Sequence, residues 1–480
     1  MNQAIRSSWI VALTMFALVL GSLTFVQFFE AEALSENDWN NRALYQDFGK
    51  DRGSILVDGT PIAESVPSDD QFNFQRVYDQ PEMYAHLTGF FSLVYGSSQL
   101  ETAMSEELSG SSEELFFDRV VRLVSGAQSQ GASVELTIDP QIQQLAWDMI
   151  PEGQQGSIVV MDPTTGDIIA MVSKPAYDPN LLAGHDSNEV INNFAQIADI
   201  PNLSIYFNPA TESLVAPGSV FKLVDAAAAL ESGEFDAESV IPNPPVLELP
   251  GTDAGLPNFT NGGCASRTEA DLEFALEQSC NTPFAQIAWE LGQEAILEQA
   301  QRFGFGEGFQ MPVDVTASQF PTDMDQAQLA QAAIGQFSVA VTPLQMAMVN
   351  AAIANDGVLM KPQLIKTVRA PDLSVIEDPE PEVFRESLSA ENANLITDWM
   401  VNVTENGTAQ PAAIPGVEVA SKTGTAEVPD RATNAWYTGF APADNPEVVV
   451  SIVMQNVDVA TGAQLTSPNA KRLIEAVLNK

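Results

Sequence analysis

Histidine is scarce in this chain, with only His86 and His185 among 480 residues. We expect both to lie in loops or at the surface, because neither has neighbours that suggest a Ser-His-Asp triad. A histidine-dependent serine hydrolase is therefore disfavoured. Cysteine is equally rare, with Cys264 and Cys280 alone. Two cysteines far from either histidine do not make a metal site, so we expect no bound metal.

Positive charge is also in short supply. The chain has 20 basic residues against 64 acidic ones, a net charge of −44. This balance excludes nucleic acid as a partner and favours a solvated, salt-adapted surface, with an acidic face for a basic partner as the alternative. A hydrophobic content of 45% excludes general disorder, and the length suits two folded units.

One long stretch without charge is present, the 21 residues from Trp9 to Phe29. A helix of this length spans about 30 Å, the thickness of a bilayer core. Arg6 precedes the stretch and acidic residues follow it, so we predict a cytoplasmic tail at 1–8, a transmembrane anchor at 9–29 and a catalytic part outside the cytoplasmic membrane. The alternative is a cleaved signal peptide, because Ala31–Ala33 resembles a cleavage site, but the run is long for one.

The rest of the chain divides into two predicted modules. Residues 30–152 are mixed and polar, with short strand-like pieces and no catalytic constellation. At the joint, 133–139 alternates as a strand and Pro140 opens a helix. The main domain, 153–480, begins with two β-rich runs across a turn, which predicts a hairpin.

Ser219 and Lys222 form the only Ser-x-x-Lys sequence in the chain. A glycine precedes Ser219 and an alanine-rich run follows, so Ser219 is predicted at a helix N-terminus. Residues three apart share a helix face, so the Ser219 hydroxyl can meet the Lys222 amine. Apolar neighbours and the helix N-terminus favour a neutral amine, which can accept the serine proton, while backbone N–H groups suit an oxyanion. For this motif alone, an ordinary exposed helix turn is the alternative.

Ser279 and Asn281 form a Ser-x-Asn sequence between the other two motifs. We expect an extended turn in which both side chains point the same way. Asn281 can then hold a peptide amide, and Ser279 can relay a proton to a leaving nitrogen. The alternative is a helix N-cap for the segment that follows. Ser-x-Asn also begins at Ser35 and Ser467, but neither lies between the other motifs.

Lys422 opens the only Lys-Thr-Gly sequence, within a run that reads as a strand. Lys422, Thr423 and Thr425 together suit a carboxylate on the substrate. Gly424 leaves no side chain to block a ligand lying along the strand. The alternative is an edge strand with a protective lysine. The three motifs in this order indicate a serine acyl-enzyme that needs no histidine.

With these motifs the chain resembles the class B penicillin-binding proteins over nearly its whole length. Further likeness lies at Arg52–Ile55, Leu136–Asp139, Ala216–Ser219, Val341–Ala347, and, for the short actinobacterial type called penicillin-binding protein A, at Leu249–Thr252 and Ser279–Thr282. The resemblance implies an α+β fold, the serine β-lactamase/penicillin-binding transpeptidase fold, in which helices flank an antiparallel sheet. It also implies an N-terminal pedestal or dimerisation-type module. One departure is Phe337, where the family usually has a glycine, and we expect a stiffer loop there.

The resemblance implies a D-Ala-D-Ala transpeptidase that cross-links peptidoglycan stem peptides. The resemblance implies that Ser219 attacks the penultimate D-Ala carbonyl, with Lys222 as the base. It also implies that Ser279 returns a proton to the departing D-Ala and that Asn281 positions the donor peptide. The Lys422 motif holds the terminal carboxylate, and the backbone N–H groups of Ser219 and Thr425 form the oxyanion hole. β-Lactams mimic the donor and acylate Ser219. The resemblance implies no cofactor, and we expect a membrane glycosyltransferase of the shape, elongation, division and sporulation family as partner.

Two rival functions remain open. A D,D-carboxypeptidase or a serine β-lactamase would use water as the acceptor, but we identify no deacylating base. A non-catalytic β-lactam sensor or cell-wall scaffold would share the fold, but a sensor should carry a signalling part.

The two cysteines lie outside the membrane by the predicted topology, where disulfides persist. A bond between Cys264 and Cys280 would hold the loop that carries Ser279 and Asn281. Two buried free thiols are the alternative.

Overall fold

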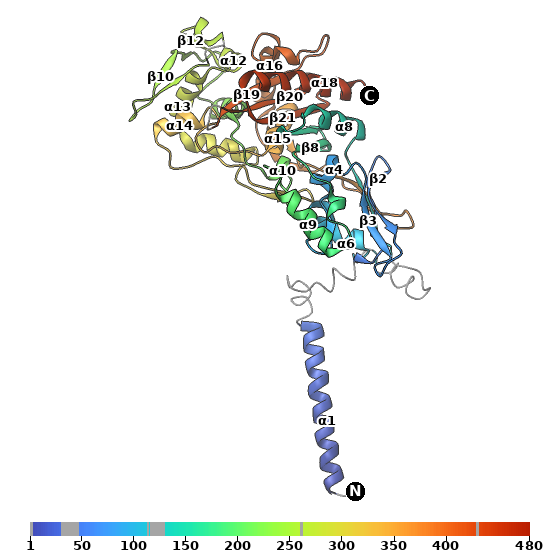
Figure 1. The fold of residues 1–480 in the computed structure, drawn as a ribbon. Helices are drawn as coiled ribbons and strands as arrows, with labels where there is room; N and C mark the ends of the chain where they lie inside the picture. Colours follow the sequence, from blue (N-terminus) through green and yellow to red (C-terminus); the bar gives the residue numbers. More distant parts are fainter. Residues whose placement is uncertain (1–2, 30–47, 113–114, 116–129, 260–262, 429–431) are drawn as a thin grey trace.

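The computed structural model describes residues 3–29, 48–112, 115, 130–259, 263–428 and 432–480 (Figure 1). Its first helix, α1 (Gln3–Thr24), continues into a short π-helical stretch, Phe25–Phe29. Within the described ranges, the segment Ile5–Gln27 is the one helix long and apolar enough to cross a membrane, and none of it is buried against the rest of the chain. The predicted bounds of the tail, the anchor and the two modules stay predictions.

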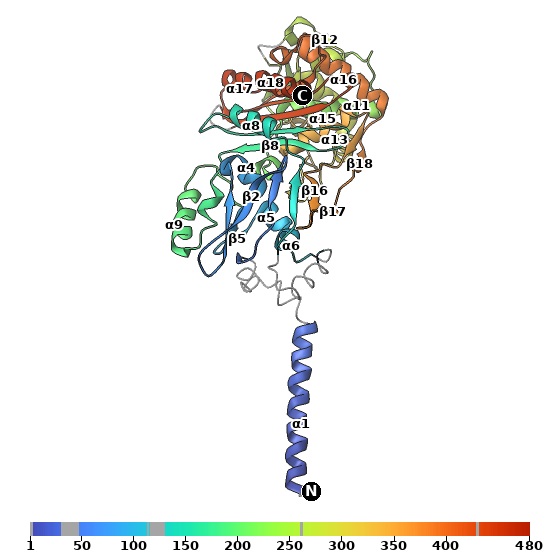
Figure 2. The same ribbon diagram turned by 90° about the vertical axis from the view of Figure 1, so that its right-hand side faces the viewer.

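The lower lobe is built on a six-stranded sheet in the order β17-β16-β6-β1-β2-β3. The strands are β1 (Ile55–Val57), β2 (Thr60–Pro67), β3 (Phe74–Tyr78), β6 (Ser133–Leu136), β16 (Ile365–Arg369) and β17 (Val375–Glu377). β6 pairs with β1 in parallel and with β16 in the antiparallel sense. Two strands from late in the chain, β16 and β17, therefore complete the N-terminal sheet, and Figure 2 shows them in the same lobe as β2.

A buried ion-pair network ties this lobe together. The helices here are α4 (Pro81–Thr88), α5 (Gln99–Ala103) and α6 (Ser105–Ser109). Glu101 of α5 is fully buried, and its two carboxylate oxygens accept from Arg52 Nε and Arg76 Nε at 2.6 Å each. Tyr78 Oη donates to the same carboxylate at 3.1 Å. One carboxylate thus holds β3, α5 and the segment before β1 in register.

The histidine prediction is wrong for His86. Its side chain is buried in α4, with Nε2 3.0 Å from the carbonyl oxygen of Pro175, and burial lowers its pKa to about 4. A ring that packs at a module joint is held by tertiary contacts that the local sequence does not show. His185 lies on a loop and contacts Asp70.

The upper lobe contains the antiparallel sheet that the sequence predicts. Its order is β19-β20-β21-β7-β8, formed by β7 (Gln155–Met161), β8 (Ile168–Lys174), β19 (Ala420–Glu427), β20 (Thr433–Ala441) and β21 (Val448–Val457). The predicted hairpin is β7 with β8. The helices α8 (Pro140–Met149) and α18 (Ser467–Leu478) cover one face, and α15 (Pro343–Ala354) covers the other (Figure 2). Every residue of β20 is buried, as expected for a central strand covered on both faces.

Further helices stand beside this sheet and carry two of the three motifs. They are α11 (Lys222–Ser232), α12 (Leu272–Glu277), α13 (Asn281–Arg302), α14 (Gln326–Ala332) and α16 (Ala390–Glu405). Nine of the eleven residues of α11 are buried, because its alanine-rich sequence lets α13 and α16 pack closely around it. Lys222 therefore stands on a central, tightly packed helix, and Ser219 lies directly before it.

Smaller elements complete the described chain. They are α9 (Ser187–Ala198), α10 (Pro209–Glu212), α17 (Val459–Leu465), and the strand pairs β4 (Phe91–Ser92) with β5 (Gly96–Ser97), β9 (Ile241–Pro242) with β12 (Glu269–Ala270), β10 (Val246–Glu248) with β11 (Gly255–Pro257), β13 (Phe309–Gln310) with β14 (Asp314–Val315), and β15 (Val358–Met360) with β18 (Val383–Glu386).

Candidate active site

Ser219 lies where the structure turns into its central helix. A 3₁₀ turn, Gly218–Phe221, leads directly into α11, so Ser219 stands at the helix N-terminus as predicted. Gly218 has a φ of +56°, and a Cβ on it would lie 2.6 Å from the carbonyl oxygen of Thr425. Only glycine permits this approach, which brings the nucleophile's turn against strand β19.

Lys222 is fully buried one turn after Ser219. Its amine donates to the backbone oxygen of Ser279 at 2.8 Å and to Asn281 Oδ1 at 2.8 Å. Among the described residues, no hydrogen bond joins Ser219 Oγ to Lys222, and catalytic contacts are often long before substrate binds. Burial lowers the pKa of Lys222 well below its ordinary value, the positive charge of Lys422 lowers it further, and Asp225 opposes them. The environment thus favours a neutral amine.

The extended turn predicted around Ser279 is wrong. Ser279 follows α12 in the left-handed region, with a φ of +58°, and Asn281 is the first residue of α13. Cys280 stands at the N-cap position between them. The two functional side chains converge because the chain reverses between two helices, a tertiary feature that residue alternation cannot reveal. Lys222 contacts both.

The position of Asn281 depends on residues that the sequence did not single out. Asn258 Oδ1 accepts from the backbone N–H of Asn281 at 2.7 Å and of Thr282 at 3.0 Å, which replaces a side-chain cap on α13. Asn258 Nδ2 donates in turn to Asn243 Oδ1 at 2.7 Å. Asn258 and Asn243 are buried. No sequence pattern marks them, since they act through a fold that joins β9, β11 and α13.

Lys422 reaches the same hydroxyl from the opposite wall of the site. It is fully buried on β19, and its amine donates to Ser279 Oγ at 2.9 Å and to the carbonyl oxygen of Thr423 at 2.9 Å. Lys222 is 3.4 Å from that same hydroxyl. Burial lowers the pKa of Lys422 to about 7. Its charge therefore changes close to neutral pH.

The rest of the Lys422 motif alternates along the edge strand β19. Thr423 and Thr425 are half-buried, and Thr423 Oγ1 lies 2.6 Å from Thr408 Oγ1. Gly424 faces the nucleophile's turn. A Cβ on it would meet Pro217 at 2.9 Å and Val220 at 3.0 Å. Its glycine therefore serves the close packing of β19 on the nucleophile's turn, and its expected role beside a ligand stays a prediction.

A disulfide joins Cys264 to Cys280, with their Cα atoms 5.6 Å apart. The bond closes a loop across the segment that leads into the Ser279 turn. Asn243 Nδ2 also donates to the carbonyl oxygen of Cys264 at 2.8 Å. The Ser279 loop is thus held by a covalent bond and by the asparagine network.

Asp225 is a buried carboxyl group that sequence reasoning missed. It follows Lys222 by three residues on α11, it is fully buried, and neither carboxylate oxygen has a hydrogen-bond partner among the residues that the structure describes. Burial raises the pKa of Asp225 well above its ordinary value, and the charge of Lys222 opposes this. The environment therefore favours a neutral acid beside a neutral amine.

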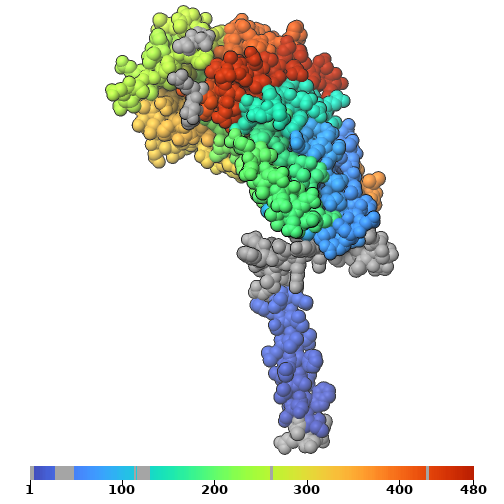
Figure 3. Space-filling model, viewed as in Figure 1, coloured from blue at the N-terminus to red at the C-terminus, as the bar shows by residue number. Residues whose placement is uncertain are grey.

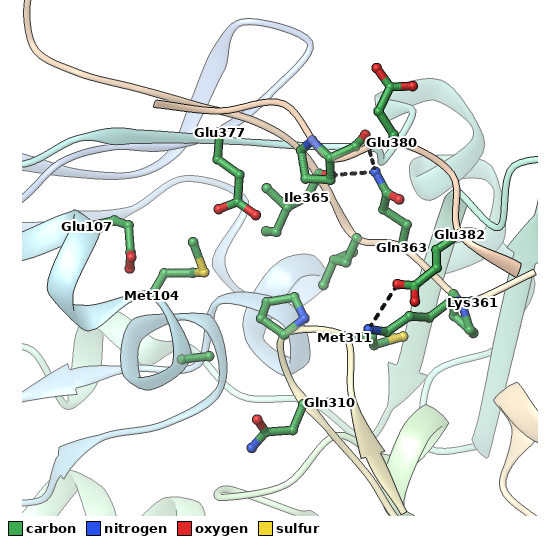
Figure 4. A pocket seen from close by; sticks show the side chains of 15 residues that line it. Met104, Glu107, Gln310, Met311, Lys361, Gln363, Ile365, Glu377, Glu380 and Glu382 are labelled. Carbon is green, nitrogen blue, oxygen red and sulfur yellow. Dashed lines mark hydrogen bonds and ion pairs between the residues drawn. The ribbon is translucent and has the colours of Figure 1, made fainter. Parts of the chain in front are cut away.

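The catalytic chemistry does not sit in the hollow between the modules. A cavity of about 400 Å³ opens there, lined by Met104, Met311, Gln363 and several glutamates, with Lys361 paired to Glu382 (Figure 4). None of the motif residues lines it. In the described part of the chain, no group of three histidine, cysteine or acidic side chains is placed to hold a metal ion.

The arrangement supports nucleophilic catalysis without histidine. A serine at a helix start has backbone N–H groups beside it for a developing oxyanion. Two buried amines converge on Ser279 Oγ, so a proton can pass between an amine and that hydroxyl. A charged Lys422 and the hydroxyls of Thr423 and Thr425 offer donors to an anionic substrate group.

Two family models match this chain. The penicillin binding protein transpeptidase domain matches residues 156–475, and the penicillin binding protein A dimerisation domain matches residues 52–134. In Figure 3 the blue residues of the second match lie toward the anchor, and the red and yellow-green residues of the first match lie away from it. Green and orange residues of the first match also lie beside the blue ones, as β16 and β17 do in the N-terminal sheet.

Named relatives and solved structures are similar over most of their length. The chain is 38% identical to the peptidoglycan D,D-transpeptidase PbpA of Mycolicibacterium smegmatis, covering 100% of both chains, and 38% identical to PbpA of Mycobacterium tuberculosis, covering 100% of this chain and 99% of the relative. The structure is similar to M. tuberculosis penicillin-binding protein A in its imipenem acyl-enzyme complex, with a TM-score of 0.85, 38% identity, and 90% of this chain and 100% of that one covered. Its penicillin G acyl-enzyme complex gives a TM-score of 0.84 at 37% identity, with 89% of this chain and 100% of that one covered.

Proposed function

The chain belongs to the penicillin-binding protein transpeptidases, and on that premise we propose how its own residues perform the reaction. It is a serine-type peptidoglycan D,D-transpeptidase. The observation that carries the proposal is the convergence of Lys222 and Lys422 on Ser279 Oγ, beside a serine at the N-terminus of α11.

In the acylation step Ser219 Oγ attacks the carbonyl carbon of the penultimate D-Ala. The serine proton passes to the neutral amine of Lys222, and the backbone N–H groups of Ser219 and Thr425 bind the oxyanion. The bond between the two D-Ala residues then breaks. Ser279 Oγ, which lies 3.4 Å from Lys222, delivers the proton to the departing amine, so the lysine returns to its neutral form.

Residues on two opposite sides of the site, on β19 and at the start of α13, position the substrate. Lys422, Thr423 and Thr425 bind the terminal carboxylate of the donor peptide, and that negative charge favours the protonated form of Lys422. Gly424 lets β19 pack close enough to the nucleophile's turn for these three residues to bind the carboxylate beside Ser219. Asn281 Nδ2 donates to the carbonyl oxygen of Pro257 at 2.9 Å, and its second N–H holds the donor amide. An amine from a neighbouring stem peptide then attacks the acyl-enzyme, with Lys222 as base.

We place the catalytic part outside the cytoplasmic membrane, with residues 1–8 inside. Arg6 before the apolar helix and acidic residues after it support this orientation. The partner we propose is a membrane glycosyltransferase of the shape, elongation, division and sporulation family, because a transpeptidase needs newly polymerised glycan beside it. Protease treatment of intact spheroplasts should remove the catalytic part, and protection of that part would contradict the orientation.

The experiment for the reaction uses the full chain in detergent. Incubation with penicillin G should give a covalent adduct whose peptide maps to Ser219, and Ser219→Ala should give none. With a peptide ending in D-Ala-D-Ala and an amine acceptor, the aminolysis product should dominate. Hydrolysis alone would instead support a carboxypeptidase, and rapid release of opened penicillin would support a β-lactamase. No reaction with either ligand would leave a scaffold as the better interpretation.

A further inference from the structure

The turn that follows α14 is fastened to the nucleophile's segment at both ends. The backbone N–H of Gly218 donates to the carbonyl oxygen of Gly335 at 2.9 Å. Val215 and Val341 exchange two backbone hydrogen bonds, at 2.8 and 2.9 Å. The residues between Gly335 and Val341 therefore lie against the chain that leads into Ser219.

This turn packs directly against the segment that carries the nucleophile. A Cβ on Gly335 would lie 2.1 Å from the carbonyl oxygen of Gly218, and a Cβ on Gly218 would lie 2.6 Å from that of Thr425. The turn, the nucleophile's segment and β19 are thus in direct contact, one behind another. Phe337 is two residues after Gly335, a separation that the chain can extend to about 7 Å at most.

Phe337 adopts a backbone conformation that its residue type disfavours. Its φ is +58°, in the left-handed region, where glycine is permitted and a bulky side chain is a steric outlier. Its side chain is 46% exposed, so burial only partly offsets the strain. Such strain clusters at functional sites because it persists there for a use other than stability.

Strain alone does not identify a site, as Leu373 shows. That residue also has a positive φ, +71°, and is 73% exposed, but it lies in the turn between β16 and β17 in the other lobe. What sets Phe337 apart is its place two residues after Gly335, which contacts Gly218 directly. Leu373 therefore serves as a matched control.

We propose that Phe337 is a substrate-contacting residue that selects the acyl donor. Its ring offers a rigid apolar surface to the side chain that precedes the scissile D-Ala–D-Ala bond, and to the acylamino side chain of a β-lactam in the same position. An aromatic ring suits this role because it has few rotamers to order and a large apolar face. The inference rests on the proposed function, since it presumes acylation at Ser219.

The test compares two β-lactams that differ only in that side chain. Penicillin G carries a phenylacetyl group, and 6-aminopenicillanic acid has a free amine in its place. The second-order rate of acylation is measured with both for the full chain in detergent and for its Phe337→Gly, Phe337→Leu and Leu373→Gly variants. Thermal unfolding of each variant is recorded as well, because removal of the left-handed strain should keep the midpoint equal or raise it.

We expect Phe337→Gly to lower the rate for penicillin G by about three- to tenfold, the range of an aromatic contact, and to leave the rate for 6-aminopenicillanic acid unchanged. Phe337→Leu should retain most of the wild-type difference between the rates for the two β-lactams. Leu373→Gly should alter neither rate. Equal losses with both compounds would overturn the inference in favour of a structural role, and so would two unchanged rates. If the β-lactams leave the wild-type chain without a covalent adduct, the proposed function and the inference both fail. The outcomes above, in which the wild type is acylated, overturn the inference alone.

Discussion

Lys422 donates a hydrogen bond to Ser279 across the site, from β19 to the loop before α13, at 2.9 Å. This contact joins two motifs that are 143 positions apart in the chain. It also places a second buried amine beside the proton path of Lys222. The charge states of the two lysines should therefore govern how activity depends on pH.

Acylation should be bell-shaped in pH. Lys422 must be protonated to bind a carboxylate, and burial lowers its pKa to about 7, so the second-order acylation rate should decline as pH rises through that value. Lys222 must be neutral, and its lowered pKa confines the acidic decline to more acidic solution than an ordinary lysine would allow. The measurement is the rate of penicillin acylation between about pH 5 and 9, a range centred on the pKa of Lys422.

Lys422→Arg is the matched control, because a guanidinium stays charged throughout this range. The alkaline decline should move to higher pH, with a lower maximum because arginine does not reproduce the geometry. A decline that stays near pH 7 in Lys422→Arg would show that another group titrates there.

Replacement of Lys222 should remove the general base. Lys222→Met and Lys222→Arg should each slow acylation by about 10²- to 10⁴-fold, since neither side chain can accept the serine proton. The arginine variant is decisive because it preserves a positive charge that could otherwise explain the effect. Rapid acylation of Lys222→Arg would mean that Lys222 contributes charge instead of basicity.

Loss of the disulfide should weaken both stability and catalysis. Cys264→Ser with Cys280→Ser should lower the free energy of unfolding by about 3 kcal/mol in the chain-entropy model, measured by urea denaturation. Acylation should also slow, because the loop that holds Ser279 gains freedom. Wild type treated with a reductant should behave in the same way. Two thiols that react with a maleimide in the denatured, unreduced chain would contradict the bond.

Glu101 should be a large stability determinant of the lower lobe. Glu101→Gln leaves Arg52 and Arg76 buried without a counter-charge and should cost about 3–5 kcal/mol, whereas the exposed Glu106→Gln should stay within about 0.5 kcal/mol. Burial alone would raise the pKa of Glu101, but the two arginines hold it below its ordinary value. The stability that ionised Glu101 contributes is therefore fully present at pH values above the ordinary pKa of glutamate. It is lost as pH falls through the pKa of Glu101 in the folded state.

The corresponding measurement is the thermal midpoint of both variants across acidic pH. The difference between wild type and Glu101→Gln should shrink as the solution becomes more acidic. A difference that does not change with pH would mean that packing and not charge accounts for the loss.

Local sequence determined a good part of this protein. The apolar helix near the N-terminus, the hairpin of β7 and β8, the helix opened by Pro140 and the place of Ser219 before α11 all follow from short-range pattern and capping rules. Such features depend on residues within one or two turns of each other. For that reason a single sequence can reveal them.

Tertiary structure alone decided the geometry of the site. Ser279 adopts a left-handed φ between two helices, Gly424 faces the nucleophile's turn, and Asn258 caps the backbone of α13. Each of these depends on a segment distant in the chain, and so does the pairing of β16 with β6 in the N-terminal sheet. Packing of distant segments sets burial, and burial sets the charge of Lys222 and Lys422. The sequence therefore named the reacting groups, while the fold supplied the environment in which they can react.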